Sequence, residues 1–153
     1  MSSLHAFEVA IELAERRRDG ARRALADTRS SCRAAQEQLE QLRDYAAQTE
    51  QRWGLHEGAQ RAPEVMRHHN AFMGRLEHAI GLQTDVARRQ DARVEHAQQA
   101  LVAAELRVQS LRKVLARRRD EQARAQARRE QKETDERASL RVRPWGQAPV
   151  VEE

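Results

Sequence analysis

The sequence has few of the residues that fill a globular core. Aromatic residues make up 3% of the 153 residues, whereas charged residues make up 34%. This mixture is typical of long helices rich in alanine, leucine, glutamate, glutamine and arginine. Glycine and proline occur six and three times, and neither occurs between Leu82 and Arg143. Nothing in that stretch therefore breaks a helix.

Other absences narrow the classes of function. No segment approaches the roughly 20 apolar residues of a membrane span, and the first eight residues lack the charge and apolar run of a secretion signal. Cys32 is the only cysteine, so we expect a reduced, cytoplasmic protein. The 24 acidic residues are interspersed among the 28 basic ones. Without a basic stripe carrying aromatics, we expect no nucleic-acid partner.

No group of residues has the spacing of an active site. Among the six histidines and the single cysteine, no pair is four residues apart, as a helical metal site requires. There is no glycine-rich phosphate loop. We expect no enzyme activity, no metal and no cofactor.

The main positive feature is an apolar seam with alternating steps of three and four residues from Leu4 to Trp53. Twelve of its fifteen positions are apolar, against nine of the other thirty-five in the stretch. The seam positions are Leu4, Phe7, Ile11, Ala14, Arg18, Ala21, Leu25, Thr28, Cys32, Ala35, Leu39, Leu42, Ala46, Thr49 and Trp53. A period of 3.5 sustained this long predicts a left-handed coiled coil.

A second seam with the same period begins after a glycine-bearing break at 54–62. It runs through Met66, His69, Met73, Leu76, Ile80, Gln83, Ala87, Gln90, Val94, Ala97, Leu101, Ala104, Val108, Leu111 and Leu115. Beyond Leu115 the apolar character fades, but strong helix formers continue to about Leu140. Pro144 and Pro149 end any helix.

Two seams joined by a short loop predict an all-α fold, an antiparallel two-helix coiled coil with a C-terminal helical overhang. We expect one hairpin domain over 1–142. Its first helix covers about 4–53, its loop about 54–62 and its second helix about 63–140. We expect the tail at 143–153 to be disordered, and residues 116–140 to project beyond the first helix.

The helix pairing has two possible registers. Seam partners have residue numbers that sum to 115, as in Leu39 with Leu76, or to 122, one heptad away. Within the seam, Gln83 and Gln90 are polar layers of the kind that fix register at some cost in stability. Arg18 has the length to extend past its apolar neighbours into water.

Tyr45 and Phe72 lie just off the two seams, each immediately before a seam residue. Their numbers sum to 117, as do those of Gln38 and Ala79, which places both pairs on the same side of the hairpin. This predicts a half-exposed aromatic patch near the loop. Such a patch either covers the seam or anchors a partner, and we favour the partner.

The chain resembles the flagellar export protein FliJ family in the order and spacing of several short sequence motifs. The similarity extends from about Leu13 to Ala138. Its motifs are Leu13-Ala14-Glu15, Cys32 with Gln38-Leu39, Leu42, Asp44-Tyr45, Phe72, Leu76-Glu77, Ala79-Ile80, Gln131-Lys132, Asp135-Glu136 and Ala138.

The resemblance implies a stalk-like antiparallel coil in the flagellar type III export machine. Its implied partners are the hexameric export ATPase, the cytoplasmic domain of the export gate protein and the export chaperones. These would hold it at the cytoplasmic side of the inner membrane. The family's gate-binding face corresponds to Gln38, Leu42, Tyr45, Phe72, Leu76 and Ala79. Thr49 and Gln83 depart from the family pattern at the edge of that face.

The candidate ATPase contacts lie in or beside the overhang. They are Arg117, Arg118, Arg124, Arg128, Gln131 and Lys132. From Ala116 to Arg143 there are ten basic and six acidic residues, which suits a polar ring lumen. Two alternatives to the flagellar stalk are the equivalent stalk of a virulence-type secretion system and a generic coiled-coil scaffold with weak nucleic-acid binding.

Overall fold

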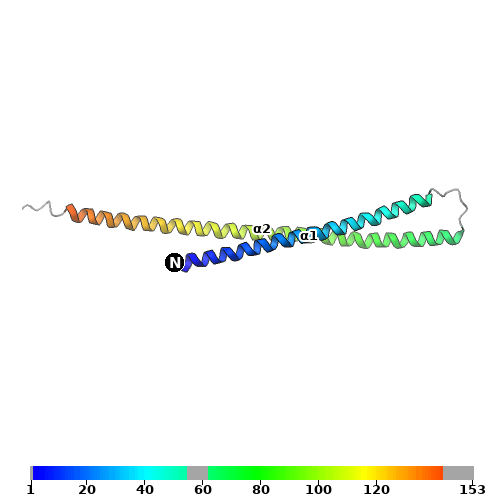
Figure 1. The fold of residues 1–153 in the computed structure, drawn as a ribbon, viewed down its shortest axis with the longest axis horizontal. Helices are drawn as coiled ribbons and strands as arrows, with labels where there is room; N and C mark the ends of the chain where they lie inside the picture. The colour runs from blue at the N-terminus through cyan, green and yellow to red at the C-terminus, as the bar shows by residue number, and fades with distance from the viewer. Residues whose placement is uncertain (1, 55–61, 143–153) are drawn as a thin grey trace, which may run out of the picture. The chain divides into compact units, whose positions relative to one another are not determined.

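The computed structural model describes residues 2–54 and 62–142, which form two long helices (Figure 1). Helix α1 spans Ser2–Gly54 and helix α2 spans Pro63–Val142. No strand occurs in these two ranges. The helices pack against each other as an antiparallel hairpin, which confirms the predicted all-α coiled coil. Residues 55–61 of the expected loop, and the expected disordered tail at 143–153, lie outside the described residues.

Local chemistry explains where α2 begins. The carbonyl oxygen of Ala62 accepts hydrogen bonds from the backbone N–H groups of Val65 and Met66, at 3.0 and 3.3 Å. Pro63 occupies the first helical position, where its missing N–H costs no helical hydrogen bond. Glu64 lies in the first turn and Arg141 in the last, and the charge of each interacts favourably with the helix dipole.

Both helices contribute to two compact units. One unit, which we call the central unit, comprises residues 15–106. The other, the terminal unit, combines residues 1–14 with residues 107–153.

The core of the central unit follows the two predicted seams. Side chains only 7–8% exposed are Leu25, Cys32, Ala35 and Leu39 of α1, and Leu76, Ala87 and Ala97 of α2. Every seam position of α1 is buried or half-buried, and so is every seam position of α2 from His69 to Leu115. The predicted 3.5-residue period is therefore confirmed. Met66, also expected on the seam, is instead 49% exposed.

The terminal unit has its own small core. Val108 is 1% exposed, and Ala14 and Leu115 are 6% and 7% exposed. Arg118 lies over the ring of Phe7, with its guanidinium carbon 4.7 Å from the ring centroid. Arg119 donates to the Glu8 carboxylate at 2.8 Å. The polar ends of these arginines therefore extend the packing by about one turn beyond Leu115.

Contacts within each unit identify the register as the one in which seam partners sum to 122. Trp53 stacks on His69 with ring centroids 3.7 Å apart, and both are seam residues. Residues that directly follow a seam position contact each other across the helices. Their residue numbers sum to 127, as this register requires. These pairs are Arg22 with Glu105, Gln36 with Asp91 and Glu8 with Arg119. The 115 register, with Leu39 opposite Leu76 and Cys32 opposite Gln83, is wrong.

The register also moves the start of the overhang. Since Arg118 and Arg119 contact α1, α2 projects alone only after Asp120, five residues later than expected. Every described residue from Ala116 to Val142 is exposed except the half-buried Ala125. At 1.5 Å per residue, the part from Glu121 to Val142 is about 33 Å long.

Candidate partner-binding surfaces

Tyr45 and Phe72 form the predicted aromatic patch in the central unit. Their rings meet edge to face, with centroids 6.0 Å apart and planes at 83°. Tyr45 is 50% exposed, and Phe72 is half-buried. Two helices that run in opposite directions thus bring residues 27 positions apart into one exposed cluster. Aromatic side chains that are already paired offer a large contact area at a low entropic cost.

The other four residues of the expected gate face divide into two groups. Gln38 is exposed and Ala79 is half-buried, and both belong to the same flank of the seam as Tyr45 and Phe72. Leu76 is only 7% exposed and Leu42 is half-buried, because both are seam residues. The exposed part of the face is therefore the flank, whereas Leu76 acts mainly as core.

The stacked pair of Trp53 and His69 extends the aromatic content of this end of the central unit. The rings are nearly parallel, with 3° between their planes. We had expected both residues on the seam, but not their contact, because it depends on the register. The pair covers the seam next to the loop-side ends of both helices.

The residues expected to contact an ATPase ring lie along the terminal unit and do not converge. Arg118 is engaged with Phe7. Arg124 pairs with Asp120 at 3.2 Å, and Arg128 donates to the Arg124 carbonyl at 3.4 Å. The Gln131 amide donates to Asp135 at 3.1 Å, whereas Arg117 and Lys132 are exposed. These are local contacts of a solvated helix, which a partner can exchange at little cost.

The polar residues on the seam are accommodated in different ways. The Gln83 amide donates to the Ala35 carbonyl at 3.0 Å, which links the two helices. By contrast, the side-chain oxygen of Gln90 is buried and accepts no hydrogen bond. Arg18 turns to the neighbouring Asp19 at 3.2 Å, and Thr28 bonds to the carbonyl of Leu25 at 2.9 Å. A buried polar atom without a partner destabilises a fold, so Gln90 is a weak layer.

The surroundings of the buried Cys32 thiol raise its pKa. Its thiol donates to the Asp91 carboxylate at 3.0 Å, and Gln36 donates to the same oxygen at 3.3 Å. The hydrogen bond to Asp91, then burial, then the negative charge of Asp91 raise the pKa of the Cys32 thiol. A thiol held in its neutral form is a poor nucleophile, so this cluster is structural.

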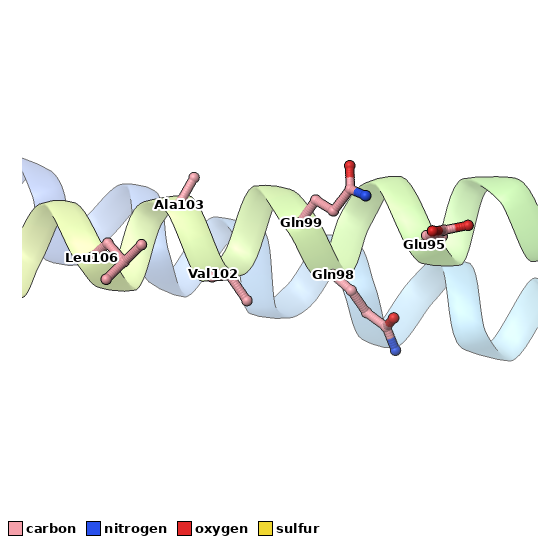
Figure 2. A pocket seen from close by; sticks show the side chains of 6 residues that line it. All are labelled: Glu95, Gln98, Gln99, Val102, Ala103 and Leu106. Atoms are coloured by element: carbon pink, nitrogen blue, oxygen red, sulfur yellow. The ribbon is translucent and has the colours of Figure 1, made fainter.

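An exposed apolar stripe on the outer face of α2 was not anticipated. Figure 2 shows its six lining side chains, all carried by α2. They are Glu95, Gln98, Gln99, Val102, Ala103 and Leu106. Val102 and Leu106 are 56% and 57% exposed. Val102 and Leu106 lie four residues apart and off the seam, and this spacing was the signal available in the sequence. Glu95 is the one titratable side chain among the six that line the stripe.

The described residues contain no group of three or more metal-binding side chains. Within the same ranges, neither helix has a stretch apolar enough to span a bilayer.

These features define a class of protein that works through helical surfaces. Comparison with known proteins identifies the family. The model of the family described as flagellar FliJ protein matches residues 3–144. The chain belongs to the FliJ family, and this membership makes it a protein associated with type III export.

No curated protein matches the chain significantly. A solved structure described as a putative YscO homolog from Chlamydia trachomatis resembles it with a TM-score of 0.71. The two chains are 18% identical, and the match covers 96% of each. At that identity the likeness concerns the fold alone.

Proposed function

We propose that the chain is a non-enzymatic, stalk-like component of the flagellar type III export apparatus. It binds the hexameric export ATPase, the cytoplasmic domain of the export gate protein and export chaperones, and it promotes ATPase assembly and substrate export. The observation that carries this proposal is the exposed α2 segment from Glu121 to Val142, which extends past the first residues of α1.

The composition of this segment supports insertion into another protein. It has six basic and five acidic residues and no apolar seam. A helical extension without tertiary packing is held only by propensity and local pairs, which leaves its side chains available to a surrounding partner. A polar ring lumen suits it, because exposed ion pairs are weak and readily exchanged. Arg124, Arg128, Gln131 and Lys132 are the contacts we assign to the ring.

The gate contact is assigned to the exposed flank around Tyr45 and Phe72. Paired aromatics that are half-exposed are common anchors of protein interfaces. Gln38 and Ala79 extend the contact along the same flank, and Leu42 and Leu76 support it from the seam. Through these partners the protein would lie at the cytoplasmic side of the inner membrane.

A truncation tests the assignment of the overhang. A chain ending at Glu121 retains Arg118 and Arg119, and therefore the contacts of the terminal unit. It should remain a folded hairpin and bind the gate domain, but no longer stimulate the cognate export ATPase. A chain ending at Leu115 is the matched control, since it also loses the contacts to Phe7 and Glu8 and should melt earlier. Undiminished stimulation by the first truncation would remove the stalk role from this segment.

The similarity in fold to the YscO homolog supports a second candidate function, the stalk of a virulence-type secretion system. Both candidates share the hairpin, and the family match favours the flagellar one. Pull-downs with the export ATPases of both systems would separate them, since only the cognate ring should retain the chain.

A further inference from the structure

The two flanks of the seam in the central unit differ in chemistry. The flank that contains Tyr45 and Phe72, which we call the neutral flank, holds the residues immediately before every second seam residue. From Val65 to Arg93 on α2 these are Val65, Phe72, Ala79, Val86 and Arg93. Opposite this stretch on α1 they are Ala24, Ser31, Gln38, Tyr45 and Arg52.

The opposite flank carries polar and charged pairs that connect the two helices. Arg22 pairs with Glu105 at 3.7 Å, and Gln36 donates to Asp91 at 3.3 Å. These contacts connect α1 to α2 across the seam, with donors on one helix and acceptors on the other. A third element docking here would have to compete with them.

The apolar side chains of the neutral flank are incompletely covered. Val65 and Tyr45 are 48% and 50% exposed. Phe72, Ala79 and Val86 are half-buried, because α1 covers only one side of each. From Val65 to Arg93 the strip is about 42 Å long at the rise of an α-helix. A strip of this length and width matches one face of a further helix packed into the groove between two others.

The few charged residues of the neutral flank indicate the chemistry of the partner that binds it. Its two charged members within this strip, Arg52 and Arg93, are both basic, and it contains no acidic residue. Arg93 is exposed and makes no ion pair with any described residue. The complementary surface is an apolar stripe bordered by carboxylates.

We infer that the neutral flank binds one amphipathic α-helix of a partner protein, whose apolar stripe is bordered by aspartate or glutamate. The helix completes a three-helix packing along Val65 to Arg93. This inference rests on the proposed gate contact, because both use Tyr45 and Phe72. It adds the kind of helix that binds there. Val65, Val86 and Arg93 lie outside the patch assigned to the gate, and they fix the length and charge of the site.

The test uses two synthetic peptides of four heptads each, the length of the strip, with leucine at the seam positions. One carries glutamate at both flanks and the other carries lysine. Like charges keep each peptide from pairing with itself. Fluorescence anisotropy with the full chain should show tighter binding of the glutamate peptide. Val86→Glu should weaken its binding more than about tenfold, because a charge is placed in an apolar contact. Arg93→Glu should weaken it about twofold to fivefold, the upper part of the range of exposed charge pairs.

Two matched variants control for the change in charge. Val102→Glu and Arg88→Glu make the same substitutions at exposed positions away from the neutral flank, and both should bind like the original chain. Equal weakening by Val102→Glu, equal binding of the lysine peptide, or no binding of the glutamate peptide would each overturn the inference. Circular dichroism confirms that all four variants stay helical.

Binding of the cytoplasmic gate domain, measured in parallel, separates this inference from the proposed function. A gate domain that binds the original chain but not Val86→Glu supports both. If the glutamate peptide binds as expected but the gate domain does not bind, the proposed gate role alone fails. A gate domain that binds Val86→Glu unchanged, while Tyr45→Ala abolishes its binding, would overturn the extended strip.

Discussion

A disulfide engineered across the seam should report the register directly. In the 122 register Cys32 lies opposite Gln90, whereas the residue one heptad away, Gln83, donates to the Ala35 carbonyl. A heptad separates these two positions by about 10.5 Å along the helix axis. Disulfides require Cα atoms within about 7 Å. Gln90→Cys should therefore form an intramolecular disulfide with Cys32, and Gln83→Cys should not.

The expected stabilisation is large enough to measure. Closing a loop of roughly 58 residues removes about 4 kcal/mol of chain entropy from the unfolded state. The oxidised Gln90→Cys variant should thus melt well above its reduced form, and non-reducing electrophoresis should show a compact monomer. The same experiment on Gln83→Cys is the control. Efficient crosslinking of Gln83→Cys with none in Gln90→Cys would refute the register, and crosslinks only between chains would refute the intramolecular hairpin.

Three further predictions concern stability and reactivity. Gln90→Leu should raise the free energy of unfolding by about 1–2 kcal/mol, because it removes a buried oxygen without a partner; a lower denaturation midpoint would show that the amide has one. Replacing Tyr45 and Phe72 together by alanine should cost about 1–2 kcal/mol, the scale of an aromatic pair plus partial burial, and leave helicity intact; global unfolding in circular dichroism would place these rings in the core. The raised pKa of Cys32 in the folded state means that its contribution to stability is complete below the unfolded-state pKa, about 8.5, and is lost as pH rises through the folded value. Above that pH, the free energy of unfolding of the original chain should therefore fall more steeply than that of Cys32→Ala. Equal dependence on pH in the two proteins would contradict the role of the Asp91 hydrogen bond.

The sequence predicted the helices and seams well, because both depend on local pattern. Leu25, Leu39 and Leu76 are buried where a period of 3.5 puts them. The seam alone could not distinguish the registers, since apolar layers align equally well in both. The choice rests on flanking pairs such as Arg22 with Glu105, whose individual contributions are small.

The candidate surfaces were predictable to different degrees. Helical phase placed Tyr45 and Phe72 on one flank because both immediately precede a seam residue. The open choice of register hid the stacking of Trp53 on His69 and moved the start of the overhang past Arg119. The exposed stripe at Val102 and Leu106 was not predicted, because neither residue belongs to a seam.

The pairing of Arg119 with Glu8 has a consequence for dimensions. Because α1 and α2 can align their apolar layers at either sum, the flanking charges determine how much of α2 remains free. One heptad of slippage to the 115 register would lengthen the free rod by about 10.5 Å. Exposed ion pairs weaken as salt is raised. The contacts of Arg118 and Arg119 with α1 therefore set the reach of the free part of α2 in this register.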